Sequence, residues 1–381
     1  MVQVNNPFIT AGYISPEYFC DRQSESNELI KQLTNGNNLA LISPRRMGKT
    51  GLVMHCFAHS EISDKYYTFF VDIYATKSLR DFILSLSKVI LERLKPFGRK
   101  AIETFVNCVK TLQAGISFDV VGNPSFNMQL GDVRDTREKY TRATLDEIFK
   151  YLEVADKPCI VAIDEFQQIA SYPEKNLEAL LRTYIQHCNN ARFIFAGSQR
   201  HIMGNMFLSP SRPFYQSVSM LYLESIPRDK YIEFAMGHFE KAGKMISPEI
   251  ITEVYDRFEG VTWYIQKMLN TLFMMTEKGG SCTGDMIQTA LQNIISSYRY
   301  NYEETLFRLP EKQKEVLITI AKEGKAKEVT GSRYIKKYRL ASASSVQAAL
   351  KGLLEKDFVS SELGTYYVYD KFFALWLSRY F

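Results

Sequence analysis

The sequence predicts an α/β protein, with a parallel-sheet core followed by an all-helical segment and a winged helix-turn-helix. In the first part of the chain, short apolar runs alternate with helical stretches. Strand signals stop after about residue 223, and the last part of the chain has several helices before two short strands. We therefore expect three domains, at residues 1–222, 223–304 and 305–381.

The core is predicted from four short apolar runs that suit buried parallel strands. They occupy residues 38–42, 67–73, 159–163 and 193–196. Helical stretches separate the runs, and this βαβα order is typical of a parallel sheet. One departure lies between the second and third runs, where residues 116–130 alternate around a Gly-Asn-Pro turn and predict an inserted β-hairpin.

The second and third domains follow from a change of pattern. Pro227 opens a helix, and further helices are expected near residues 248–258, 262–276 and 283–297. From Pro310 onward, helices near residues 311–322, 332–338 and 342–356 precede strands at residues 358–360 and 366–369. Three helices followed by a hairpin are the arrangement of a winged helix.

Composition fits a globular cytoplasmic protein. Of the 381 residues, 46% are hydrophobic and 23% are charged, which predicts a packed core. Six cysteines without a CxxC pair predict reduced, mostly buried thiols. No basic segment followed by an apolar one opens the chain, and no apolar stretch approaches the length of a membrane span. We therefore expect neither a signal peptide nor a membrane partner.

The net charge of +5 is confined to one end of the chain. Residues 311–381 hold 13 Lys and Arg against 8 Asp and Glu, and the preceding residues sum to zero. Electrostatic attraction for nucleic acid or an acidic partner is therefore expected only in the C-terminal segment.

Residues 43–50 read SPRRMGKT between an apolar run and a helical stretch, which is the context of a phosphate-binding loop (Walker A). Ser43 replaces the usual first glycine, and Gly48 lets the backbone approach phosphates. We expect Lys49 to neutralise the β- and γ-phosphates of ATP and Thr50 to ligate Mg²⁺. The alternative for this motif alone is a solvated turn with a surface lysine. The residues expected to contact the nucleotide are Ser43, Pro44, Arg45, Arg46, Met47, Gly48, Lys49, Thr50 and Gly51.

A second motif, of the Walker B type, stands at the end of another predicted strand. Asp164 and Glu165 follow residues 159–163, which places both acids at the carboxyl edge of the sheet, where such sheets bind ligands. Asp164 is expected to hold Mg²⁺, usually through water, and Glu165 to orient and polarise the attacking water. Ser198 follows the next strand and is expected to contact the γ-phosphate or that water, unless it only ends the strand in a turn.

These motifs occur together with the stretches given next and with the predicted winged helix, so that the combination extends over nearly the whole chain. The stretches are Asn6 to Phe8, Tyr18 to Glu25, DEFQ at residues 164–167, and GSQRHIMGNMF at residues 197–207. With them, the chain resembles the archaeal-type AAA+ ATPases of the STAND class. The resemblance implies that residues from Phe19 to Arg22 lie against adenine, with Asp21 where the family usually has glycine. It also implies a lid motif at residues 260–262, here without the usual proline.

The resemblance implies a slow, Mg-dependent ATPase that acts as a switch, because ATP and ADP hold the domains in different arrangements. Two alternatives are a DNA-binding regulator gated by nucleotide and an ATP-binding scaffold with negligible hydrolysis. Arg200 and Arg212 stand where an arginine could stabilise the transferring charge, although an ordinary solvated arginine is the simpler interpretation of each.

Three further features of the sequence are weaker indications of function. His55 and His59 are four residues apart on a predicted helix, a spacing that can bind zinc, but no third ligand follows and a structural pair is favoured. The winged helix suggests a DNA or a protein partner. Its basic residues lie beside the predicted recognition helix at residues 342–356, in which Lys351 is the only basic residue before the end. The apolar side chains of residues 366–381 predict a segment that docks on another surface.

Overall fold

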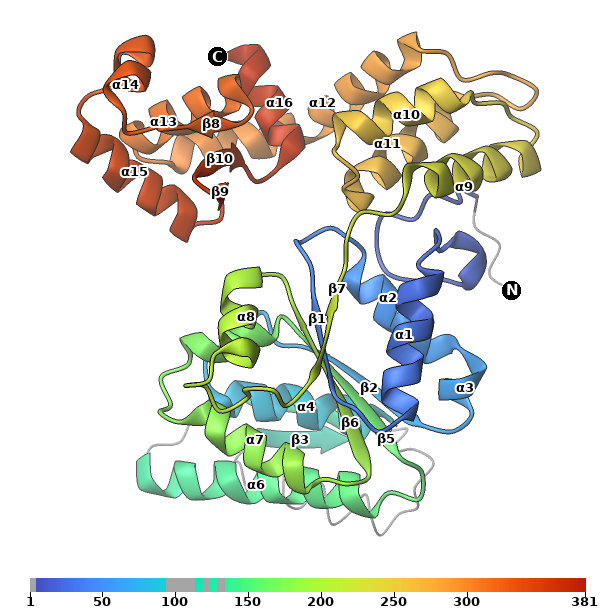
Figure 1. Ribbon diagram of the computed structural model, residues 1–381, viewed down its shortest axis with the longest axis vertical. Helices are drawn as coiled ribbons and strands as arrows, with labels where there is room; N and C mark the ends of the chain where they lie inside the picture. The colour runs from blue at the N-terminus through green and yellow to red at the C-terminus, as the bar shows by residue number, and fades with distance from the viewer. Residues whose placement is uncertain (1–4, 94–113, 119–123, 129–133) are drawn as a thin grey trace. The chain divides into compact units, whose positions relative to one another are not determined.

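The computed structural model describes residues 5–93, 114–118, 124–128 and 134–381 (Figure 1). These residues form two compact units. One unit holds residues 11–226, and the other holds residues 227–381 together with the described residues before Ala11. The chain therefore passes between the units twice, after Thr10 and after Ile226.

The first unit is built on a five-stranded parallel sheet in the order β2-β5-β6-β1-β7. The strands are β1 (Leu39–Ile42), β2 (Tyr67–Asp72), β5 (Cys159–Asp164), β6 (Ala191–Gly197) and β7 (Ser219–Tyr222). Four of the strands and their parallel pairing confirm the prediction. The sequence analysis missed β7, because this edge strand is only partly buried and lacks a continuous apolar run.

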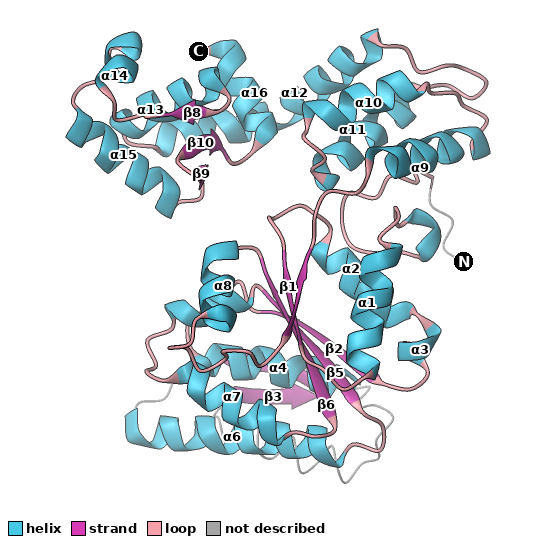
Figure 2. Ribbon diagram, in the orientation of Figure 1, coloured by secondary structure: helices cyan, strands magenta, loops and turns pink. Residues whose placement is uncertain are grey.

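Helices cover both faces of this sheet (Figure 2). The helices on one side are α1 (Gln23–Thr34), α2 (Lys49–Ala58) and α3 (Ser60–Ser63). Those on the other side are α4 (Leu79–Arg93), α6 (Arg134–Val154), α7 (Leu177–His187) and α8 (Arg200–Leu208). Between the sheet and this second layer, the buried rings of Phe166, Phe195, Phe207 and Phe214 pack on one another, which fixes the ends of β5 and β6 against α8.

The predicted hairpin is present between α4 and α6. Its strands are β3 (Ala114–Phe118) and β4 (Pro124–Met128), which pair antiparallel with Ile116 opposite Phe126. The Gly-Asn part of the predicted turn, residues 122–123, lies outside the described residues.

The second unit begins with a helical segment that the start of the chain completes. Its helices are α9 (Arg228–Lys241), α10 (Pro248–Arg257), α11 (Thr262–Met275) and α12 (Asp285–Arg308). Phe8 is fully buried among the rings of Phe234, Phe239 and Phe273. Asn270 donates to Phe8 O at 2.8 Å, so the N-terminal segment is part of this core.

The winged helix has the predicted elements and two more. The structure contains α13 (Glu311–Glu323), α14 (Ser332–Tyr338), α15 (Ala343–Glu355), α16 (Lys371–Tyr380) and a sheet ordered β8 (Ala326–Lys327), β10 (Thr365–Val368), β9 (Val359–Glu362). The two-residue strand β8 was too short to leave a periodic signal. Helix α16 forms most of the apolar segment that was expected to dock on another surface. It docks on the helical segment of the same unit, where Phe372 contacts Phe258 and Tyr264, and Phe373 contacts Tyr302 of α12.

Polar contacts join the same two parts of this unit. The Tyr264 hydroxyl accepts from the backbone N–H of Lys371 at 2.9 Å and donates to Tyr369 O at 3.4 Å. The Glu259 carboxylate pairs with Lys325 through one oxygen and with Lys371 through the other. The loop before α11 and the winged helix are therefore held together by rings, hydrogen bonds and charges.

Two further observations concern predictions from composition. The cysteines in the described residues are all buried free thiols: Cys20, Cys56, Cys159, Cys188 and Cys282. No helix in the described ranges has the length and apolar character needed to cross a bilayer.

Candidate active site

The phosphate-binding loop motif connects β1 to α2. Gly48 immediately precedes α2 with φ 88°, a left-handed conformation that glycine adopts without strain. Ser43 is fully buried, and its backbone N–H donates to Gly197 O at 3.2 Å, which ties the loop to the end of β6. Ser43 is not among the residues with positive φ. Its position therefore does not require the glycine that the motif usually carries.

The charged side chains of the two motifs meet at the carboxyl edge of the sheet. Lys49 Nζ lies 2.7 Å from Asp164 Oδ1 and 3.3 Å from Glu165 Oε1. The Thr50 hydroxyl donates to Asp164 Oδ2 at 2.8 Å. In the parallel sheet β6 lies between β5 and β1, and the carboxyl ends of these strands are close enough for side chains more than 100 residues apart in sequence to come into contact.

Glu165 is held from two directions. Its backbone is left-handed (φ 56°), so the chain turns sharply after β5. Glu165 Oε2 accepts from the Ser198 hydroxyl at 2.7 Å and from the side-chain amide of Gln167. Ser198, which was expected near the attacking water, thus contacts the carboxylate expected to orient it. Gln167 was not singled out, although it is the last residue of the DEFQ segment.

The local charge suits a divalent cation. Lys49 and Asp164 are each less than a tenth exposed, and one ammonium group faces the two carboxylates of Asp164 and Glu165. A buried excess of negative charge favours a cation. The Thr50 hydroxyl and Asp164 carboxylate are hard oxygen donors of the kind Mg²⁺ prefers. Within the described residues no three His, Cys, Asp or Glu side chains form a metal cluster, so Mg²⁺ would need phosphate and water ligands as well.

Beside the start of α2 lies an aromatic group that includes one of the residues expected near adenine. The Phe19 ring stacks on His55 with centroids 4.5 Å apart, and a Cβ on Gly51 would lie 3.4 Å from it. Tyr13 meets both rings edge-on, and its hydroxyl lies 3.1 Å from His55 Nδ1. Partial burial, with a smaller effect of His59, lowers the pKa of His55. Neither Tyr13 nor His55 was predicted at the site, since aromatic contacts of this kind leave no motif.

Arg22, also expected near adenine, is buried against the phosphate-binding loop. Its guanidinium donates to Met47 O at 3.1 Å and pairs with Glu25 at 2.7 Å. Asp21 and Arg22 both have positive φ, at 50° and 70°. The usual family glycine before this arginine is thus replaced by a residue type that tolerates the left-handed region.

The other candidate residues lie in separate contacts. Arg212 pairs with Glu178, and Arg200 pairs with Glu224 at 3.3 Å. The guanidinium of Arg45 stands over the Tyr74 ring at 5.5 Å. His59 accepts from the backbone N–H of Glu61, so its ring serves the start of α3.

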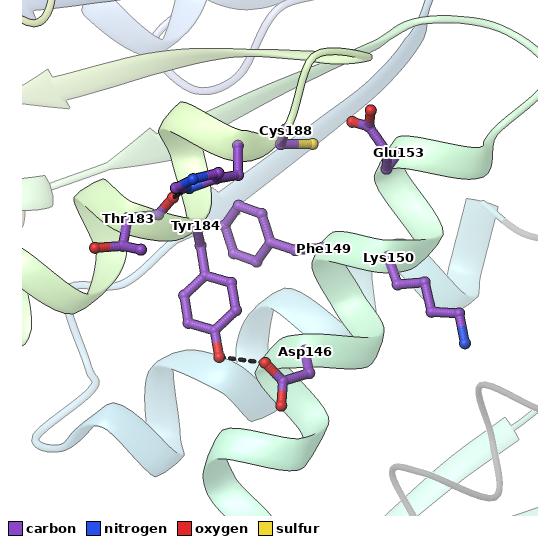
Figure 3. Close-up of a pocket in the computed structure, with 8 residues that line it drawn as sticks. Asp146, Phe149, Lys150, Glu153, Thr183, Tyr184 and Cys188 are labelled. Atoms are coloured by element: carbon purple, nitrogen blue, oxygen red, sulfur yellow. Dashed lines mark hydrogen bonds between the residues drawn. The ribbon is translucent and has the colours of Figure 1, made fainter.

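A cavity of about 320 Å³ lies on helices α6 and α7 (Figure 3). Its lining residues are Asp146, Phe149, Lys150, Glu153, Thr183, Tyr184, His187 and Cys188. Figure 3 shows the Tyr184 hydroxyl bonded to Asp146 across it. No residue of the two nucleotide motifs lines this cavity, so it is a separate feature.

On the winged helix, the basic side chains in and beside α14 divide into two groups. Lys325 and Lys337 form ion pairs, with Glu259 and Glu323. Four more bases near α14 are exposed: Lys327, Arg333, Lys336 and Arg339. On α15, Lys351 pairs with Glu355 at 3.8 Å, so the exposed positive charge lies beside this helix.

Two known protein families match parts of the chain. The family described as an ATPase domain predominantly from Archaea matches residues 19–268. The family described as a probable winged helix domain matches residues 300–379. No curated protein sequence matches the chain.

Several solved structures share the fold. The Walker-type ATPase of Pyrococcus abyssi is 18% identical, with a TM-score of 0.61 over 97% of this chain and 99% of that chain. The Aeropyrum pernix ORC1 protein, solved in complex with DNA, is 14% identical, with a TM-score of 0.55 over 95% of this chain and 93% of that chain. The Aeropyrum pernix ORC2 protein, in ADPNP and ADP complexes, is 16% identical, with a TM-score of 0.55 over 98% and 95%.

Proposed function

Because the chain belongs to the family of ATPase domains found predominantly in Archaea, we propose that it binds ATP with Mg²⁺ at the edge of its parallel sheet and hydrolyses it slowly. The observation that carries this proposal is the convergence of Lys49, Thr50, Asp164 and Glu165. One ammonium, one hydroxyl and two carboxylates are the groups that Mg-nucleotide chemistry requires.

Each side chain has a role that its position supports. Lys49, at the start of α2, neutralises the β- and γ-phosphates together with the N–H groups of the loop. Thr50 and Asp164 are the residues that would hold Mg²⁺, which would supply charge neutralisation at the transferred phosphoryl group. Glu165 orients the attacking water, and Ser198 holds the Glu165 carboxylate. Phe19 packs on α2 beside Gly51, a position from which it can cover adenine.

The same reasoning extends to a switch of the STAND kind. The two units are separate compact bodies joined by two passages of the chain. A γ-phosphate and its metal can bridge such bodies, and hydrolysis then removes the bridge. Within the second unit, the winged helix is tied to the helical segment through Tyr264 and Glu259.

Phosphate release by the purified protein tests the ATPase proposal. Lys49→Ala is expected to lose nucleotide affinity, because Lys49 is the cation that meets the phosphates. Glu165→Gln is expected to bind ATP and retain it, because only the activation of water is removed. Glu153→Gln, on α6 away from both motifs, is the matched control. Turnover at the parental rate in both site variants would show that these residues are not the ATPase site. ATP binding without turnover in the parent would favour the alternative of an ATP-binding scaffold with negligible hydrolysis.

The switch has its own test. Fluorescent labels on one residue of each unit report the distance between units in Glu165→Gln with ATP and in the parent with ADP. We expect two different distance distributions. Identical distributions would exclude the switch while leaving hydrolysis intact.

DNA binding gated by nucleotide is a second candidate, favoured by the exposed bases near α14. A phosphate-contacting patch gives duplex binding that weakens steeply with salt. Replacing Arg333 and Lys336 with alanine is then expected to reduce the salt dependence by about one unit of slope per lost contact. Lys150→Ala, on α6, is the control. Parental salt dependence after both substitutions would exclude this patch as a DNA surface.

A further inference from the structure

We propose that Gln167 is a positioning residue: its side-chain amide fixes the Glu165 carboxylate in the orientation needed to activate water. This inference rests on the proposed function and adds a positioning residue to the same site. Gln167 lies two residues beyond Glu165, in the 3-10 helix η2 (Phe166–Ser171) that follows β5.

The hydrogen bonds around Glu165 show which groups donate and which accept. Gln167 Nε2 donates to Glu165 Oε2 and, at 3.4 Å, to the Ser198 oxygen. The Ser198 hydroxyl is committed as a donor to the same carboxylate oxygen, so it can only accept from Gln167. The three side chains form a closed set in which both donors converge on Glu165 Oε2.

Packing holds the amide in this place. Gln167 is 5% exposed, and a Cβ on Gly197 would lie 2.7 Å from Gln167 Oε1. The glycine at the end of β6 therefore leaves room for the amide. Gln167 Oε1 is buried and has no hydrogen-bond partner in the part of the chain that the structure describes. An apolar side chain would fill this space without leaving a buried acceptor unsatisfied, so filling space alone does not explain a glutamine here.

The other oxygen of Glu165 faces Lys49 at 3.3 Å. In the proposed function Lys49 binds the phosphates, so its ammonium group interacts with the nucleotide as well as with Glu165. Gln167 and Ser198 remain as neutral donors that hold the carboxylate in place. A positioning residue of this kind acts on kcat more than on the affinity for ATP.

Two substitutions separate this role from a structural one. Gln167→Met keeps the volume and removes the donor, and we expect kcat to fall about tenfold to a hundredfold, as for lost outer-shell partners, with the KM for ATP within about twofold of the parent. Gln167→Glu keeps the length of the side chain but replaces its donor with a second carboxylate beside Glu165. We expect kcat to fall by a similar factor, about tenfold to a hundredfold, again with the KM for ATP close to that of the parent.

The control is Gln168→Glu, which makes the same charge change one residue away, where the side chain contacts Thr76 O and Ser171. Its kcat is expected to match that of the parent. Parental kcat in Gln167→Met or in Gln167→Glu would overturn the role of Gln167. If Gln167→Met does not bind ATP or melts at a much lower temperature, the comparison of the two glutamate variants decides.

Glu165→Gln separates failure of this inference from failure of the proposed function. If Glu165→Gln turns over ATP at the parental rate, or the parent releases no phosphate, the proposed function fails and the role of Gln167 fails with it. If Glu165→Gln is inactive while both Gln167 variants behave as the parent, only the role of Gln167 is wrong.

Discussion

Thr50 and Asp164 are joined directly, with the threonine hydroxyl donating to the carboxylate at 2.8 Å. The contact links the first turn of α2 to the last residue of β5. Since Lys49 binds the other oxygen of the same carboxylate, Asp164 is the residue on which the two motifs meet. A magnesium ion at this site would be held by the Thr50 hydroxyl and, through water, by the Asp164 carboxylate, and the hydrogen bond shows that the two groups already lie together.

This contact predicts how Thr50 variants respond to magnesium. Thr50→Ala removes the hydroxyl, and we expect the Mg²⁺ concentration for half-maximal ATP binding to rise about tenfold or more, in the range for perturbed metal ligation. Thr50→Ser keeps the oxygen and is expected to stay near the parent. A fluorescent ATP analogue titrated at several Mg²⁺ concentrations measures the effect. Equal magnesium dependence in the alanine and serine variants would exclude Thr50 as a ligand.

A second prediction concerns two glycines that differ in their surroundings. A Cβ on Gly197 would lie 2.5 Å from Met203 Sδ, whereas a Cβ on Gly204, in α8, would meet nothing within 4 Å. We expect Gly197→Ala to lower the free energy of unfolding by about 1–3 kcal/mol through overpacking. Gly204→Ala is expected to raise it by roughly 0.5–1 kcal/mol, because alanine favours the helix. Denaturant unfolding of both variants checks the contrast, and equal midpoints would contradict it.

Much of this site could be predicted because parallel sheets obey a simple rule. Apolar runs marked four of the five strands, and the rule that ligands bind at the carboxyl edge was enough to place Lys49 and Asp164 together. The edge strand β7 was missed because it carries little of the buried face. Secondary structure followed periodicity where burial was one-sided, as in α10 and α15, and did not where an element was very short, as in β8.

Contacts made by conformation and packing could not be predicted in the same way. Tyr13 and His55 reach Phe19 from different segments, and a sequence gives no spacing between rings. Gln167 was visible in the DEFQ segment, but its role depends on the 3-10 turn after β5 that aims it back at Glu165. The expected contact of Arg22 with adenine stays a prediction, and only the fold shows that its guanidinium donates to Met47 O.

Asp21 gives a third prediction, since its φ of 50° lies where most side chains are strained. Asp21→Gly is expected to change the free energy of unfolding by less than about 1 kcal/mol, because relief of strain is offset by the entropy of the unfolded chain. Asp21→Val is expected to cost about 1–2 kcal/mol or more, because a β-branched residue is poorly tolerated there. The melting temperature measures both, and a valine variant as stable as the parent would contradict the backbone conformation.

The last prediction concerns the pH dependence of the link between the helical segment and the winged helix. Partial burial raises the pKa of Glu259, but hydrogen bonds from Lys325 and Lys371 outweigh it, and the net pKa lies below its ordinary value of 4.5. A carboxyl whose folded-state pKa is lowered stabilises the fold above its unfolded-state pKa, and this contribution is lost as the pH falls through the folded-state value.

Glu259→Gln should therefore lower the melting temperature of the second unit at pH 7, and the difference from the parent should shrink as the pH falls below about 4.5. Because all three side chains are partly exposed, we expect only about 1 kcal/mol at pH 7. Glu253→Gln, which removes a helix-surface pair with Arg257 at 2.8 Å, is the matched control and should cost less than about 0.5 kcal/mol. A Glu259→Gln penalty that stays constant from pH 7 to below pH 4 would show that the charge of Glu259 does not hold the winged helix.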